Sequence, residues 1–343
     1  MDAASPIDYA REIRAALPVD VFAPVRSRLA WLPLHATIVV GATVAVASGV
    51  GGWWLAALLV PVIGLSFAGL SMLGHELLHG AVIRGARAIQ VLGWICFAPF
   101  VLSPRLWIGW HNKVHHGHTM QGGVDPDAYP TLEAYRGNTV LRVVTRVFSF
   151  GRNSPLRVVS LVLGFTVQSL HMLVAAQTSA GLSAARHRLA IAQTLLGVAL
   201  WTAVAFAVGP LAFLFVYVLP LLVANSIVMA YIFTNHGLSS LTEHNDPLLN
   251  SLSVTTPRWY GFLTLDFGLH VEHHVIPSIS GRHAWRVREV LQARWPDRYQ
   301  SMPLGRALRQ LLRTARVYRT PTTLHDPWSG REWPTLERAA IES

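Results

Sequence analysis

Charged residues are scarce in this sequence, and lysine and cysteine are almost absent. Charged residues make up 13% of the 343 positions, whereas hydrophobic residues make up 52%. A soluble globular domain is about 25% charged, so the composition excludes an ordinary soluble protein. The mean hydropathy of +0.38 points the same way. We therefore expect a multi-pass membrane protein in which one membrane domain uses most of the chain.

The near absence of cysteine and lysine bears on disulfide bonds and on the source of the positive charge. Cys96 is the only cysteine, so no disulfide can form within the chain. Lys113 is the only lysine, and the net charge of +10 therefore comes almost entirely from arginine. The basic residues lie between and after the apolar runs, as the positive-inside rule predicts for cytoplasmic segments. That rule explains the charge better than nucleic-acid binding does, and we expect no nucleic-acid partner.

Four apolar runs are close to the length of about 20 residues that crosses a bilayer. They cover residues 29–50, 53–74, 189–208 and 211–233. The turn inside each pair, "GVGG" at 49–52 and "GP" at 209–210, carries no charge, whereas arginines flank the other ends. We therefore predict an all-α integral membrane fold with four transmembrane helices and both termini in the cytoplasm.

Two further apolar segments fit a transmembrane helix less well. Residues 89–103 are too few, and residues 156–176 have arginines at both ends, so we expect interfacial or re-entrant helices there. "LGRALRQLLRTARVY" at 304–318 predicts a basic amphipathic helix, either on the membrane surface or capping the cytoplasmic part. The predicted divisions are an N-terminal cytoplasmic or interfacial segment (1–28), a membrane domain (29–300) and a basic cytoplasmic C-terminal segment (301–343).

Histidine, by contrast, is abundant, and nine of the 16 histidines gather in short motifs. They are His75 and His79 in "HELLH", His111, His115 and His116 in "HNKVHH", His236 in "FTNHGL", and His270, His273 and His274 in "HVEHH". The H-x-x-x-H spacing places two imidazoles on one helical face, and an adjacent histidine is rotated by about 100°. Because all the motifs emerge on the cytoplasmic side in this topology, we predict a histidine-rich cap that binds two metal ions.

"HELLH" alone also matches the H-E-x-x-H signature of zinc metalloproteases, in which Glu76 would be the general base. A zinc protease uses three protein ligands and one water, so nine histidines are too many for one zinc ion. A third protease ligand is typically an aspartate in a later span, and residues 189–208 and 211–233 contain no acid. Imidazole suits iron, copper, zinc and nickel, so the ligand type alone does not choose the metal.

The set of three histidine motifs between pairs of spans resembles the membrane fatty acid desaturase family, which includes related hydroxylases. "GVDPDAYPT" after the second motif and "HVEHHVIPSISG" around the third are similar to acyl-lipid and sphingolipid desaturases. The resemblance covers about residues 71–300. It implies a centre of two iron ions per chain, O2 as co-substrate, and an external electron donor such as ferredoxin or cytochrome b5 with its reductase. The implied substrate is a membrane lipid or an acyl thioester.

Carried over by residue, the resemblance implies these metal ligands: His75, His79, His111, His115, His116, His236, His270, His273 and His274. No catalytic residue separate from the metal centre is expected. Glu76, Glu272, Asp125 and Asp127 could orient ligand imidazoles through their second N–H group, although the two aspartates equally fit a turn or a helix cap. Asn235 could hold a metal-bound water.

The predicted function is therefore O2-dependent insertion of a double bond into the acyl chain of a lipid, at an active site on the cytoplasmic face. Two alternatives remain open. One is a lipid or carotenoid hydroxylase or oxygenase on the same scaffold, and the other is an intramembrane zinc protease.

Overall fold

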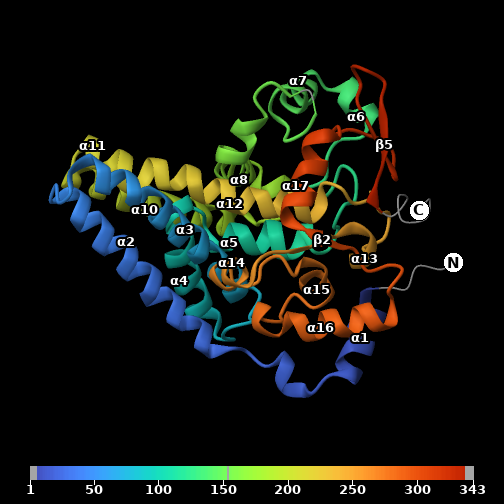
Figure 1. Cartoon of the computed structure of the whole chain (residues 1–343), viewed down its shortest axis with the longest axis horizontal. Coiled ribbons are helices and arrows are strands. Elements are labelled where there is room, and N and C mark those ends of the chain that lie inside the picture. Colours follow the sequence, from blue (N-terminus) through green and yellow to red (C-terminus); the bar gives the residue numbers. More distant parts are fainter. Residues whose placement is uncertain (1–5, 153, 337–343) are drawn as a thin grey trace. The chain divides into compact units, whose positions relative to one another are not determined.

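The computed structural model describes residues 6–152 and 154–336, and these residues form a mostly helical protein (Figure 1). The chain separates into two compact units that alternate along the sequence. The first unit contains the chain up to residue 23, residues 111–161 and the chain from 229 onward, and the second contains residues 24–110 and 162–228. The prediction of an all-α membrane fold is confirmed, with only short strands in the described chain.

The second unit holds most of the long apolar helices. Its elements are η2 (Arg26–Ala30), α2 (Trp31–Ala47), α3 (Gly52–Leu78), α4 (Ala86–Phe97), η3 (Ala98–Phe100), α5 (Pro104–Trp107), α9 (Ala176–Ser179), α10 (Ala184–Val208), α11 (Pro210–Phe213) and η5 (Leu214–Val218), with most of α8 (Arg157–Val174) and the first half of α12 (Leu219–His236). The turn between α2 and α3 needs positive φ at Gly49, Gly51 and Gly52, which glycine adopts without steric cost. This explains the "GVGG" sequence there.

Five helical segments are long and apolar enough to cross a membrane, one more than the four predicted. They are Val19–Ala47, Gly52–Leu78, Arg157–Val174, Ala184–Val208 and Pro210–His236. The additional one is α8, which lies in the segment 156–176 predicted above to be interfacial or re-entrant. The predicted dip at 89–103 lies in the helix pair Ala86–Phe100 and Pro104–His115, which bends by 100° as a broken or re-entrant segment does.

Polar contacts attach this bent pair to α10 within the second unit. The Trp94 indole donates to the Gln193 carbonyl oxygen at 2.9 Å, and the Ser103 hydroxyl donates to Gln193 Oε1 at 2.7 Å. The Trp201 indole donates to the Ala98 carbonyl oxygen at 2.7 Å. Ala98 belongs to the non-α-helical bend, and its carbonyl oxygen also accepts from the Val101 backbone N–H at 3.1 Å. The bend is therefore held by side chains of a neighbouring span.

The first unit contains the shorter helices and all the strands of the described chain. Its elements are α1 (Pro6–Ala16), η1 (Val19–Phe22), most of η4 (Ile108–His115), α6 (Leu132–Gly137), α7 (Thr139–Phe148), the end of α12, α13 (Pro247–Asn250), β1 (Ser253–Thr255), α14 (Arg258–Leu263), α15 (His270–Val275), α16 (Gly281–Arg294), β2 (Ser301–Pro303), α17 (Leu304–Arg313), β3 (Tyr318–Thr320), β4 (Thr323–His325) and β5 (Glu332–Pro334). β1 pairs with β2 in parallel, and β3, β4 and β5 form an antiparallel sheet in that order.

An apolar core packs against the face of α15 that carries Val271 and Val275. Val271 and Val275 of α15 pack in one cluster with Tyr9 of α1 and with Val287 and Leu291 of α16. α1 lies along α16 in the same unit (Figure 1). Burying these side chains on one face of α15 leaves its histidines on the other.

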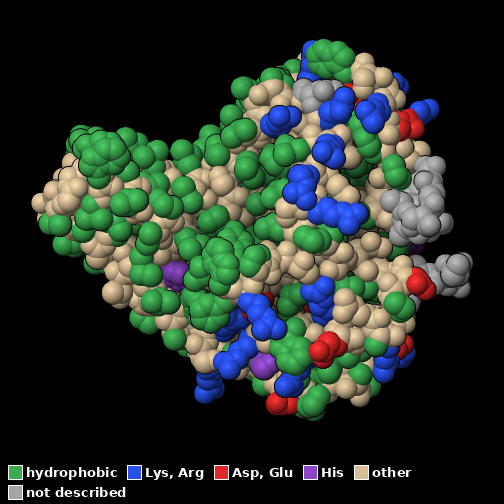
Figure 2. Space-filling view, in the orientation of Figure 1, with side chains coloured by type: hydrophobic (Ala, Val, Ile, Leu, Met, Phe, Trp, Pro, Cys, Tyr) green, Lys and Arg blue, Asp and Glu red, His purple; other side chains and the backbone are tan. Residues whose placement is uncertain are grey.

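The predicted amphipathic helix at 304–318 ends earlier than expected. α17 stops at Arg313, and the chain continues into β3. Ala307 and Leu311 are buried, whereas Arg306 and Arg309 are exposed. The apolar face of α17 is thus covered by its own unit, which favours the capping alternative. Lys and Arg side chains gather over the region of α6, α7 and α17, and the visible face around the α10–α11 turn shows no coloured charge (Figure 2).

Candidate metal centre

The second histidine motif lies on a π-helix. η4 covers Ile108–His115, and His116 follows it directly. A π-helix has a wider turn than an α-helix and occurs frequently at functional sites. It carries His111 and His115, both buried. Their rings stack at a centroid distance of 5.1 Å.

The third motif lies on α15, whose first turn is held by a side chain from β1. The Ser253 hydroxyl oxygen accepts hydrogen bonds from the backbone N–H groups of His270 at 3.1 Å and Val271 at 3.0 Å. The same hydroxyl donates to the Glu272 carboxylate at 2.5 Å. Free N–H groups at a helix start need such acceptors. Ser253 thereby sets the direction in which the α15 histidines project.

Four buried histidines of the first unit converge on one point. One ring nitrogen from each of His115, His236, His270 and His274 lies within 4.8 Å of the others. His270 Nε2 is 2.9 Å from His236 Nε2 and 3.1 Å from His274 Nε2. Neutral imidazoles carry only one N–H each, so a cation at the centre is the simplest partner for so many converging nitrogens.

The opposite nitrogens of three of these rings have their own acceptors. His115 Nδ1 lies 2.9 Å from Asp125 Oδ1, and His236 Nδ1 lies 3.0 Å from the Asn250 carbonyl oxygen. His274 Nδ1 lies 3.3 Å from the Thr119 hydroxyl. Donating the Nδ1 proton outward leaves the Nε2 lone pair directed inward, which is the tautomer that a metal ligand requires.

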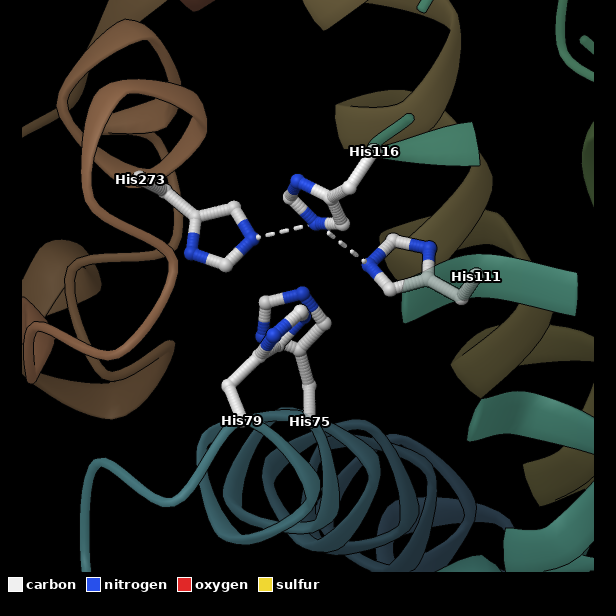
Figure 3. A group of neighbouring side chains, drawn as sticks. All are labelled: His75, His79, His111, His116 and His273. Carbon is white, nitrogen blue, oxygen red and sulfur yellow. Dashed lines mark hydrogen bonds between the residues drawn. The ribbon is translucent and has the colours of Figure 1, made fainter. Parts of the chain in front are cut away.

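Three more histidines of the same unit form a second set. His116 Nε2 lies 3.2 Å from His111 Nε2 and 3.0 Å from His273 Nε2 (Figure 3). In the other unit, His75 and His79 project side by side from the last turns of α3, with ring centroids 4.7 Å apart. The structure thus brings seven of the nine predicted ligands together in the first unit, and it pairs the remaining two on α3.

For Asp125 the sequence allowed two roles, orienting a ligand imidazole or forming a turn or helix cap. Besides His115, its carboxylate accepts from the backbone N–H groups of Met120 at 2.7 Å and Asp127 at 3.0 Å. Burial raises the pKa of Asp125, but His115, His236 and the hydrogen bond from the Asp127 backbone together hold that pKa below its usual range. The carboxylate both organises the turn and accepts from an imidazole. Asp127 Oδ2 is 3.5 Å from the same His115 nitrogen.

Glu272 differs from its predicted role. Among the described residues its carboxylate accepts from the hydroxyls of Ser253 and Tyr299 rather than from an imidazole. Burial raises the pKa of Glu272, and these two hydrogen bonds lower it in part. Glu272 therefore bonds to Ser253, whose hydroxyl holds the start of α15, and to no imidazole among the described residues.

The two remaining candidates lie on α3 and α12. Glu76 Oε2 is 3.8 Å from Arg28 Nε, so Glu76 faces a buried cation. Asn235 is fully buried, and neither its Oδ1 nor its Nδ2 atom has a hydrogen-bond partner in the described chain. A buried amide without partners needs a water or another ligand to satisfy it. This position, next to His236, is in keeping with the water-holding role considered for Asn235.

Sequence reasoning missed the groups that hold the ligands in place. Thr119, Ser253 and Tyr299 belong to no histidine motif, and Asn250 contributes a backbone carbonyl, which no side-chain signature reports. For Thr119, closeness in sequence could have suggested the contact, because Thr119 comes three residues after His116. The others depend on tertiary contacts.

The comparisons with known proteins agree with this geometry. A model of the fatty acid desaturase family ("Fatty acid desaturase") matches residues 52–305, which include all nine histidines predicted as ligands. The chain belongs to the fatty acid desaturase family. A curated relative, the sn-1 oleoyl-lipid 12-desaturase of Arthrospira platensis, is 22% identical over 288 residues, covering 80% of this chain and 79% of the relative. Family membership and the converging nitrogens together identify a membrane oxidoreductase with a histidine-rich centre able to hold metal.

Proposed function

We propose that this desaturase uses O2 and two electrons from an external donor to introduce a double bond into the acyl chain of a membrane lipid. The reaction balances as –CH2–CH2– plus O2, two electrons and two protons giving –CH=CH– and two waters. The observation that carries the proposal is the convergence of imidazole Nε2 atoms at 2.9–3.2 Å in two sets. Neutral nitrogen donors in this number suit two iron ions.

The proposed ligands divide between the two ions. One ion is held by His115, His236, His270 and His274. His111, His116 and His273 would hold the other ion. His75 and His79, at the end of α3, are the further ligands that the family resemblance implies. The iron supplies the oxidation of an unactivated C–H bond, which no side chain can perform. Asp125, Thr119 and the Asn250 carbonyl keep the Nδ1 protons outward, so that the ligand nitrogens stay available.

The proposed electron donor is a separate protein, such as ferredoxin or cytochrome b5 with its reductase. We propose that the centre faces the cytoplasm, because the basic segments that follow the positive-inside rule flank the histidine motifs. A soluble donor would meet the centre there.

The direct test is lipid profiling of a host that expresses the protein, with double-bond positions mapped. We expect a new double bond with the wild type and none with His79→Ala. The matched control is His118→Ala, because His118 is exposed and its Nδ1 hydrogen-bonds to the Gln121 side chain. A product with an added hydroxyl group and no double bond would favour the hydroxylase alternative.

Glu76→Gln separates the desaturase from the zinc-protease alternative. In a protease this substitution abolishes turnover while the metal stays bound. In a desaturase Glu76 is not a general base, so we expect activity to fall by no more than about 10–100-fold. Complete loss of activity with metal retained, together with cleavage of a peptide by the wild type, would contradict the proposed function.

A further inference from the structure

The second unit contains a cavity of about 900 Å³ beside α4 and α10. Its wall is largely apolar and includes Val91 and Trp94 of α4 and Leu196 of α10. This volume lies within the range of about 300–1,000 Å³ typical of ligand pockets. Leu78, the last residue of α3 and the residue before His79, also lines it. The cavity therefore reaches the helical turn that carries one of the proposed ligands.

Two arginines interrupt this apolar wall. Arg87 and Arg105 line the cavity, and its lining contains no acidic residue. Neither guanidinium has a hydrogen-bond or ion-pair partner among the residues that the structure describes. In the same unit, Arg28 does have a carboxylate partner in Glu76. A guanidinium fork matches phosphate with two parallel hydrogen bonds. Arg87 is exposed and Arg105 is half-buried, so each guanidinium can bind an anionic group that enters the cavity.

A third polar group completes the pattern. Gln90 lines the cavity, and its Oε1 atom is a buried acceptor without a hydrogen-bond partner in the described part of the chain. Gln193, which also lines the cavity, has its Oε1 bonded to Ser103 and its carbonyl oxygen bonded to Trp94. The acceptor left open is thus that of Gln90. An unsatisfied buried acceptor favours a ligand with an O–H or N–H donor near its anionic group.

We propose that this cavity binds a membrane phospholipid and selects its head group. Arg87 and Arg105 bind the phosphate, Gln90 Oε1 accepts from a head-group hydroxyl or amine, and Val91, Trp94 and Leu196 contact an acyl chain. The occupant is a bilayer lipid rather than a soluble thioester because the lining comes from two candidate membrane spans, α3 and α10, and from the bent helix pair. That this lipid is the substrate rests on the proposed function.

The test is lipid binding to the full-length protein in a non-ionic detergent, followed by native mass spectrometry without O2 or a reductant. We expect dioctanoyl phosphatidylglycerol, which is anionic and carries hydroxyls, to bind about tenfold more tightly than dioctanoyl phosphatidylcholine, which has no donor. Arg87→Gln with Arg105→Gln should remove that preference. The matched control is Arg186→Gln with Arg188→Gln, which removes the same charge from exposed positions of α10 in the same unit.

Gln90→Leu provides a second, uncharged variant. It should weaken phosphatidylglycerol binding severalfold and leave phosphatidylcholine binding unchanged. Equal affinity of the wild type for the two lipids, an equal loss in the control pair, or displacement of the lipid by coenzyme A would overturn the proposal. Because binding is measured without turnover, absence of double bonds in the lipid profile contradicts the proposed function alone.

Discussion

The carboxylate of Asp125 joins a proposed metal ligand to the turn after the second histidine motif. It accepts from His115 Nδ1 and from two backbone N–H groups, those of Met120 and Asp127. A residue that orients a ligand and also closes a turn affects metal binding through both contacts. The two roles can be separated by a substitution that keeps the size of the side chain.

Asp125→Asn keeps one carbonyl acceptor and removes the negative charge beside His115. We expect iron affinity or desaturation to fall by about 10–100-fold, as for other groups that orient metal ligands. The measurement is iron content per chain together with double-bond yield. Asp297→Asn, at an exposed position of the same unit, is the matched control. Unchanged iron content and yield in Asp125→Asn would show that Asp125 is a turn residue only.

Tyr299 and Ser253 together satisfy the buried Glu272 carboxylate. Tyr299→Phe removes the donor to one carboxylate oxygen, so we expect the free energy of unfolding to fall by about 1–3 kcal/mol. Thermal and denaturant unfolding measure this. Tyr129→Phe is the control, because the buried Tyr129 hydroxyl has no hydrogen-bond partner in the described chain. Equal effects of the two substitutions would mean that the Glu272 contact contributes nothing specific.

At the scale of elements, α8 is the segment on which pattern and structure differ. Its length and apolarity allow a crossing, whereas the arginines at both ends favour one side of the membrane. Within the second unit, Asn225 of α12 accepts from the Thr166 backbone N–H at 3.0 Å and donates to the Thr166 hydroxyl at 3.0 Å. Such polar contacts between apolar helices favour packing of α8 against α12, and they are compatible with either topology.

Cysteine labelling from the two sides of the membrane distinguishes these topologies. Because Cys96 is the only cysteine, Cys96→Ala provides a clean background. Asn138→Cys and Ser183→Cys flank α8, and we expect both to be labelled from the cytoplasm, because moving the flanking arginines across the membrane is costly. Val50→Cys, in the first uncharged turn, and Leu211→Cys, directly after the second, should be labelled from the opposite side.

Labelling of Asn138→Cys and Ser183→Cys from opposite sides would show that α8 crosses the membrane. In that case the bent pair Ala86–Phe100 and Pro104–His115 must also cross if the termini are to stay on one side. Reporter fusions at the two termini check that requirement independently.

At the scale of the whole molecule, metal ions would link distant parts of the chain. The first unit alone brings histidines from residues 111–116, 236 and 270–274 to shared points. We expect about two iron ions per chain, and each stabilises the fold by about 4 kcal/mol when free iron is 1,000-fold above its dissociation constant. Removing iron with a chelator should therefore lower the midpoint of thermal unfolding, measured by scanning fluorimetry. One tightly held zinc ion and no iron would contradict this prediction.

Much of the general design follows from local sequence. Apolar runs near the length of a bilayer and their flanking arginines determine the membrane class, because both properties act on short segments. The histidine motifs and their spacing likewise identify the family and the candidate ligands. The sequence was ambiguous where two local signals conflict. In α8 the length and apolarity favour a crossing, whereas the arginines at both ends favour one side of the membrane. The division of the chain at residues 28 and 300 stays a prediction.

Only the tertiary structure decides which groups meet. His274 reaches Thr119 across 155 positions, and Glu272 meets Tyr299 across 27. From the sequence we predicted that Glu272 orients an imidazole, whereas in the structure its carboxylate accepts from the hydroxyls of Ser253 and Tyr299. Gln90 belongs to no motif, and its role depends on which acceptors its neighbours leave open. Side-chain period and spacing report the face of one helix, whereas hydrogen-bond partners and cavities depend on how separate helices pack.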